Sequence, residues 1–175
     1  MHYFKIFILC LNCFWLNACS THVSDYTNSS PDFKLEHYFN GNIKAWGILQ
    51  NYSGKVSRRF TVDIKAKWDG NQGELKEYFE FDDGEKQTRI WTLTKIANGV
   101  YEGQANDVIG TAQIKQVGMA VNLQYQLSVP VDGDSYIFTI DDWMYQIDDK
   151  RVFNKSTLSK LGVEVAQLTI FFEKQ

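Results

Sequence analysis

Apolar and polar residues alternate along most of the chain. In residues 60–68 and 121–129 every second residue is apolar and those between are polar or charged, as in a strand with one buried and one solvated side. Weaker alternation predicts eight further strands, at residues 33–40, 43–50, 74–81, 89–96, 101–107, 111–116, 136–147 and 165–172. Tight turns are favoured between them because Gly adopts positive φ, at Asn40-Gly41, Ser53-Gly54, Asp69-Gly70, Asp83-Gly84, Asn98-Gly99 and Asp132-Gly133.

About ten hairpin-linked strands, each with one apolar side, hide that side best by closing into a barrel, which also removes exposed edges. The sequence therefore predicts an all-β fold, an antiparallel barrel of about eight to ten strands. A β-sandwich and a half-barrel wrapped on a helix are the alternatives. One short helix is predicted near the C-terminus, with Ser156 as N-cap, a body over 157–161 and Gly162 as C-cap.

The N-terminus has the layout of a secretory signal peptide. Lys5 precedes an apolar run from Ile6 to Leu11, which is shorter than the about 20 residues that span a bilayer. Residues 16–19, Leu-Asn-Ala-Cys, resemble a lipobox. The resemblance implies that Cys19 receives diacylglycerol and then, after cleavage, an acyl chain such as palmitate on its amine. Plain secretion with Cys19 as a free thiol is the alternative.

The expected organisation is a signal peptide at 1–18, a lipidated N-terminus and flexible polar tether at 19–32, and a single barrel domain at 33–175. Ser20 follows the cysteine. In lipoproteins of Gram-negative bacteria that look like this, a residue other than Asp there goes with export to the outer membrane. We therefore expect a lipid-anchored domain in the cell envelope, at the outer membrane and facing the periplasm.

Composition removes several classes of function. Cys10, Cys13 and Cys19 are the chain's three cysteines, so the barrel domain has neither a disulfide nor a cysteine metal site. A formal net charge of −3 without a basic run argues against a nucleic-acid partner. The sequence lacks catalytic triad, HExxH, phosphate-loop and dinucleotide motifs. We expect no metal and no cofactor, and an enzymatic activity is not favoured.

Three charged residues are candidates for the barrel interior. They share strand phase with apolar neighbours: Arg89 with Trp91 and Leu93, Asp107 with Tyr101 and Ala105, and Asp142 with Phe138 and Met144. An unpaired buried charge costs several kcal/mol, so these groups would need partners. They could form a structural polar cluster, anchor the head group of an apolar ligand, or supply a general acid or base at Asp107 or Asp142. The aromatic candidates for lining a cavity are Trp91, Tyr101, Tyr136 and Trp143.

Several motifs together resemble one family of proteobacterial lipoproteins that carry a domain of unknown function. The motifs are the lipobox, Tyr38-Phe39-Asn40-Gly41, Asp83-Gly84-Glu85 before Arg89-Ile90-Trp91, residues 101–110, and Asp141-Asp142-Trp143-Met144. The resemblance implies a calycin-like (lipocalin-like) barrel. Genes of this family often neighbour those of enzymes that modify membrane fatty acids, which implies a connection to lipids.

The leading hypothesis is an outer-membrane-anchored lipoprotein that binds a fatty acyl chain or another amphiphilic lipid in its barrel, with Arg89 near the ligand's carboxylate and a role in envelope lipid handling. Its partners would be the membrane, through Cys19, and the lipid ligand. An enzyme acting on a modified lipid and a structural envelope factor with a solid barrel are the alternatives. A cavity of roughly 300 Å³ or more that reaches Arg89 would support binding.

Overall fold

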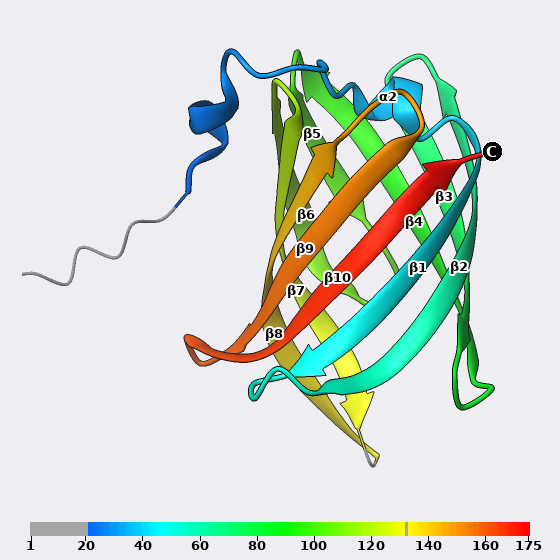
Figure 1. Ribbon diagram of the computed structural model, residues 1–175, viewed down its shortest axis with the longest axis vertical. Helices are drawn as coiled ribbons and strands as arrows, with labels where there is room; N and C mark the ends of the chain where they lie inside the picture. The colour runs from blue at the N-terminus through cyan, green and yellow to red at the C-terminus, as the bar shows by residue number, and fades with distance from the viewer. Residues whose placement is uncertain (1–20, 132) are drawn as a thin grey trace, which may run out of the picture.

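The computed structural model describes residues 21–131 and 133–175. The expected signal peptide and Cys19 lie outside these residues and stay predictions. Ten antiparallel strands form a closed barrel in the order β1-β10-β9-β8-β7-β6-β5-β4-β3-β2 (Figure 1). Each strand pairs with its neighbours in sequence, and the pairing of β1 with β10 closes the sheet.

The strands are long and joined by short turns. Their bounds are β1 Gly41–Asn51, β2 Val56–Asp69, β3 Gln72–Phe81, β4 Lys86–Ala97, β5 Val100–Gln104, β6 Val108–Val117, β7 Ala120–Val131, β8 Asp134–Gln146, β9 Arg151–Lys160 and β10 Val163–Lys174. Alternate residues face the interior, and in β2 these are Phe60, Val62, Ile64 and Ala66, all buried. The all-β barrel predicted from the alternation is confirmed.

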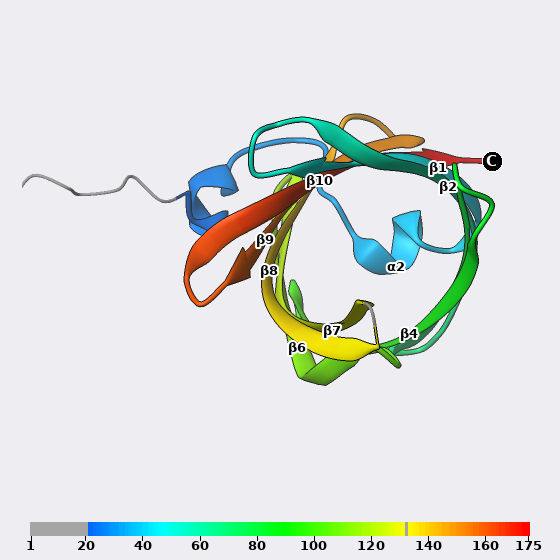
Figure 2. The same ribbon diagram turned by 90° about the horizontal axis from the view of Figure 1, so that it is seen from below.

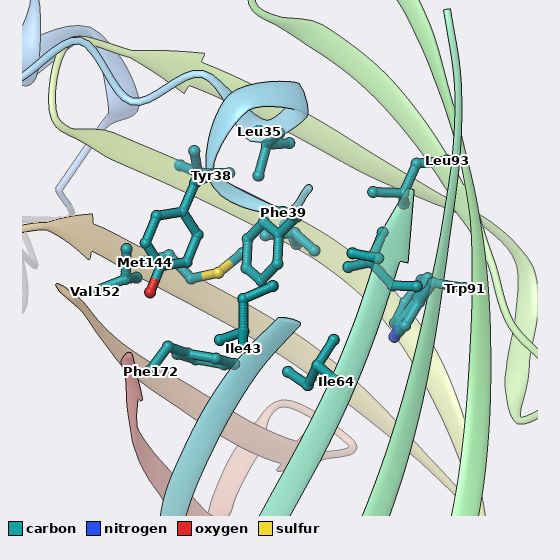
Figure 3. Packing of buried hydrophobic residues seen from close by; sticks show 14 of the residues in the cluster. Leu35, Tyr38, Phe39, Ile43, Ile64, Trp91, Leu93, Met144, Val152 and Phe172 are labelled. Carbon is teal, nitrogen blue, oxygen red and sulfur yellow. The ribbon is translucent and has the colours of Figure 1, made fainter. Parts of the chain in front are cut away.

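A short helix, α2 (Leu35–Tyr38), closes one end of the barrel. Viewed from the opposite end, it lies within the outline of the barrel (Figure 2). Its residue Leu35 and the flanking Phe33 and Phe39 are at most 3% exposed, and the Phe39 ring meets Phe172 edge-on with centroids 5.9 Å apart. Figure 3 shows Leu35 and Phe39 among the other buried side chains of the core. We call this the α2 end.

The strand predicted at 33–40 is therefore wrong. Leu35, Tyr38 and Phe39 are spaced as i, i+3 and i+4, which puts them on one face of a helical turn. Glu36 on the other side of that turn accepts hydrogen bonds from Lys95 and from the Tyr101 hydroxyl, at 2.6 Å for the latter. Burial raises the pKa of Glu36, but these bonds outweigh it and hold the pKa at about 2. The ion pair thus joins the helix to the barrel wall.

Residues 21–32 differ from the expected flexible tether. They contain a 3₁₀ turn, η2 (Val23–Tyr26), which lies against the outer wall at β6 and β7. The Tyr26 ring contacts the rings of Trp143 and Tyr145, with centroids 6.0 and 5.7 Å apart, and the Met119 N–H donates to the Ser29 hydroxyl at 2.9 Å. Aromatic packing and this hydrogen bond hold the segment in place.

No helix within the described residues is long and apolar enough to cross a membrane.

The helix predicted near the C-terminus is also wrong, because its residues form the end of β9 and the turn into β10. Leu161 and Gly162 have φ of 52° and 80°, the double positive φ of a type I′ hairpin turn. Ser156, the predicted N-cap, is an inward-facing strand residue that is 1% exposed. The alternation was hidden because two inward residues of β9, Asn154 and Ser156, are polar.

Replacement of Phe39 by Ala tests the role of α2 in stability. Because Phe39 is 3% exposed in the core, the substitution should lower the free energy of unfolding by about 3–5 kcal/mol in urea titrations. Tyr52→Ala is the matched control, since Tyr52 is 84% exposed and its loss should change stability by less than about 0.5 kcal/mol. Equal effects of the two substitutions would contradict the role given to α2.

Candidate functional site

Inward-facing side chains become more exposed with distance from the α2 end. On β3, Leu75 is buried, whereas Phe79 and Phe81 are partly exposed. On β10, Phe172 is buried, whereas Leu168 and Ile170 are partly exposed. The half of the interior beside α2 is therefore filled by the core. The other half, toward the turns β1–β2, β3–β4, β7–β8 and β9–β10, retains uncovered apolar surface, and we call it the far half.

A cavity of about 100 Å³ lies between the two halves. It is mostly apolar and also contains four ionisable side chains, Glu77, Arg89, Tyr125 and Asp142. The volume is below the range of about 300–1,000 Å³ for pockets that enclose whole ligands, but an engineered cavity of about 150 Å³ is known to hold benzene. The cavity can thus enclose one end of a ligand whose remainder lies along the apolar wall of the far half.

Arg89 on β4 is engaged by two carboxylates. Its Nε and Nη2 donate to Oδ2 of Asp107 at 2.9 and 2.6 Å. Its Nη1 lies 4.0 Å from Oε2 of Glu77, the residue directly opposite it on β3. Arg89 and Asp107 are each about a quarter exposed, at 23% and 26%, and Glu77 is 13% exposed. The charge-assisted bonds to Asp107 compensate the partial desolvation of the guanidinium.

Asp142 on β8 enters the cavity from the opposite wall. It accepts a hydrogen bond from the Asn154 amide, and the Asn154 Oδ1 in turn accepts one from the Ser156 hydroxyl at 3.2 Å. These donors come from β9, because Ser156 lies directly opposite Asp142 and Asn154 lies opposite Met144. The hydroxyl of Tyr125 on β7 has no hydrogen-bond partner among the described residues, so it can donate to a molecule in the cavity.

The two carboxyls in the cavity are weak acids. Burial raises the pKa of Glu77 to about 7, opposed by Arg89 and aided by Asp107 and Asp142. Burial likewise raises the pKa of Asp142 to about 7, opposed by the neighbouring polar side chains of Asn154 and Ser156. The pKa of Tyr125 is raised, chiefly by burial, so its phenol stays neutral. Near neutral pH each carboxyl is therefore protonated in part of the molecules and can donate a hydrogen bond.

The structure brings together some of the residues singled out from the sequence. Arg89 and Asp107 are in direct contact, and Asp142 shares the cavity with Arg89. Trp91 lines the same cavity. The free guanidinium that the sequence reasoning assigned to a ligand carboxylate is instead held by Asp107.

The other three aromatic candidates do not line the cavity. Tyr101 is fully buried at the α2 end, where its hydroxyl binds Glu36. Tyr136 lies nearer the far end, with the Lys160 ammonium 3.9 Å from its ring centroid. Trp143 lies on the outer wall, stacked on Tyr145. Its assignment to the interior was inconsistent with the alternation, which cannot place both Asp142 and Trp143 inside.

Sequence reasoning missed Glu77 and Tyr125. Both share strand phase with apolar neighbours, which is the criterion that singles out Arg89 in the sequence. Glu77 has the phase of Leu75 and Phe79, and Tyr125 has the phase of Leu123. Glu77 is inconspicuous in the sequence because the alternation of its strand is weak.

The arrangement supplies hydrogen bonds and weak acids. Within residues 21–131 and 133–175 no group of three His, Cys, Asp or Glu side chains could hold a metal ion. The cavity lining in the described part of the chain contains no Ser, Cys, His or Lys. Polar recognition at one end of an apolar ligand is the chemistry for which this lining is best suited.

Glu77→Gln tests the raised pKa of Glu77. An acid whose pKa rises from 4.5 to about 7 on folding stabilises the fold below pH 4.5, and this contribution is lost as pH rises through 7. The groups that face Glu77 are Arg89, Asp107, Asp142 and Trp91. Because Gln stays neutral, the variant should match the wild type near pH 4 and exceed its stability near pH 8 by an amount on the order of 1–3 kcal/mol.

Thermal denaturation across this pH range measures the difference. Glu80→Gln is the control, since Glu80 is exposed on the same strand and should give the wild-type pH profile. A Glu77→Gln profile parallel to that of the wild type would contradict the raised pKa.

Comparison with known proteins places the fold among existing barrels. The S-type phycobiliprotein lyase of Guillardia theta superimposes with a TM-score of 0.60 over 89% of this chain and 98% of that chain, at 9% identity. A protein of unknown function from the DUF3598 family of Nostoc punctiforme also gives a TM-score of 0.60, at 15% identity, over 83% of this chain and about half, 51%, of that chain. These likenesses concern the fold, and the predicted calycin-like barrel is confirmed.

No curated protein matches the sequence. A family of proteins of unknown function, DUF3833, has a sequence model that matches residues 13–174 of this chain. The chain therefore belongs to the DUF3833 family.

Proposed function

We propose that the barrel binds an amphiphile, such as a fatty acyl compound, with its apolar part in the far half and its polar end at Glu77, Arg89, Tyr125 and Asp142. This proposal rests on the increase in the exposure of inward-facing side chains with distance from the α2 end. Phe79, Leu168 and Ile170 face the interior yet stay partly exposed. Covering such surface contributes about 25 cal/mol per Å², so an apolar ligand has a ready driving force there.

The position of the polar cluster sets the orientation of the ligand. Glu77, Arg89 and Asp142 line the cavity at the depth where the filled half meets the far half. A wholly apolar molecule would leave the remaining donors and acceptors of these groups without hydrogen bonds, at a cost of about 1–3 kcal/mol for each one buried unsatisfied. An amphiphile that enters from the far end with its polar end first satisfies them.

We further propose that Cys19 is lipidated and anchors the chain to the outer membrane, facing the periplasm, with a role in envelope lipid handling. The lipobox-like residues 16–19 support this. Thr21 lies at the outer wall beside Trp143, and two residues extend at most about 7 Å, so the anchor would be attached close to the side of the barrel. A bound amphiphile and the lipid surface would then be near each other.

The binding proposal can be tested by occupying the far half of the barrel with a side chain. The full-length Cys19→Ser protein, purified without detergent, should retain a ligand that native mass spectrometry detects as added mass. Leu168→Trp points a large ring into the cavity and should remove most of the ligand-bound species. Gln167 precedes Leu168 on β10 and faces outward, so Gln167→Trp should leave the ligand-bound population unchanged. A uniformly empty protein that binds no added amphiphile would refute the proposal.

Lipidation can be tested by metabolic labelling with an alkyne-bearing palmitate. The wild type should carry the label and fractionate with outer membranes, because acyl chains contribute about 0.8 kcal/mol per buried CH₂. Cys19→Ser should lose both the label and the membrane association, while Cys13→Ser should keep both. An unlabelled wild-type protein in the soluble fraction would show that Cys19 is not an anchor.

A further inference from the structure

The charges around the cavity are unbalanced. One guanidinium, Arg89, is accompanied by three carboxyls, those of Glu77, Asp107 and Asp142. Lys and His are absent from the described cavity lining. The cluster is close to neutral when both Glu77 and Asp142 are protonated, and it is negative when either ionises. The cluster therefore has no unpaired positive charge that could bind an anionic ligand.

One hydrogen-bonding edge of the Arg89 guanidinium is already occupied. Nε and Nη2 form one edge of the guanidinium fork, and both donate to Asp107. Nη1 lies 4.0 Å from Oε2 of Glu77, so this carboxyl stands beside the remaining N–H groups without a hydrogen bond to them. A ligand carboxylate could reach Arg89 only by displacing Asp107 or by lying against Glu77, and like charges in such proximity cost several kcal/mol.

Several groups can still donate a hydrogen bond to a ligand. The Tyr125 hydroxyl has no partner among the described residues. The carboxyls of Glu77 and Asp142 can donate when protonated. These donors suit a carbonyl or hydroxyl oxygen, which brings no charge into a cavity that already penalises charge through desolvation.

We infer that the polar end of the ligand is uncharged, as in an acyl ester, an alcohol or an amide, and that the cavity discriminates against free fatty carboxylates. This inference rests on the proposed binding function and narrows its ligand class. Asp107 is the residue that sets the discrimination, because it occupies one edge of the Arg89 guanidinium and neutralises its charge. The carboxylate partner that the sequence suggested for Arg89 is thus supplied by the protein itself.

Ligands that share one chain and differ in the head group test this inference. The full-length Cys19→Ser protein at pH 7.5 is offered an equimolar mixture of octanoic acid, methyl octanoate, octanol and octylamine, and native mass spectrometry compares the bound populations. Methyl octanoate and octanol should each bind at least about tenfold more tightly than octanoate. Equal or tighter binding of octanoate, or a preference for octylamine, would overturn the inference.

A gain of function provides the second test. Asp107→Asn removes the carboxylate that holds Arg89, so the variant should bind octanoate at least about tenfold more tightly than the wild type does. Asp63→Asn is the matched control, because Asp63 is on the outer face and pairs with Lys44 at 2.8 Å, and it should keep the wild-type order of ligands. Thermal melting establishes that both variants are folded.

The outcomes separate the two proposals. If Asp107→Asn unfolds, the comparison of ligands on the wild-type barrel still decides the inference. If octanoate binds best, the barrel is a binding protein and the inference alone is wrong. If no member of the series binds and Leu168→Trp has no effect on ligand content, the proposed function fails, and the inference fails with it.

Discussion

The hydrogen-bonded pairing of β1 with β10 is the constraint on which the rest of the structure depends. It runs from Ile43 opposite Lys174 to Asn51 opposite Ala166, and it leaves the sheet without a free edge. Once the sheet is closed, every second residue of ten strands must face one shared interior. The contents of that interior then decide both stability and function.

The interior is filled unequally. At one end, Leu35 of α2 and the following Phe39 pack among buried strand residues. Glu36 joins the helix to β4 and β5 through Lys95 and Tyr101. No element of the described chain fills the far half in the same way, and Phe79 and Ile170 remain partly exposed there. The stability of the barrel is therefore concentrated at the α2 end, which leaves the far half free to serve as a site.

Alternation in the sequence was sufficient for the fold class and for most strands, because a closed sheet buries one face of each strand. It failed where tertiary context overrides it. Residues 33–40 contain the helix α2 instead of a strand. The polar inward residues Asn154 and Ser156 interrupt the alternation of β9. The predicted number of strands was close to that observed because one false strand replaced one missed strand.

Strand phase also located part of the site. It placed Arg89, Asp107 and Asp142 on inward positions, and the structure joins the first two. The strand phase of a residue cannot show which carboxylate binds which edge of the Arg89 guanidinium. That contact depends on where the turn between β5 and β6 lies in the folded barrel. The carboxylate of Asp107 reaches Arg89 from this turn, and a sequence pattern contains no signal for such a contact.

The polar cluster is poorly explained as a device for stability alone. Clusters that serve only structure are expected to satisfy each buried polar atom. Here Oδ1 of Asp107 is buried without a partner, and the Tyr125 hydroxyl has no hydrogen-bond partner among the described residues. Apolar residues of similar size would cost less at these positions. The Tyr125 hydroxyl lies in a cavity that also contains partly exposed apolar side chains such as Phe79 and Ile170, and the proposed amphiphile would satisfy both.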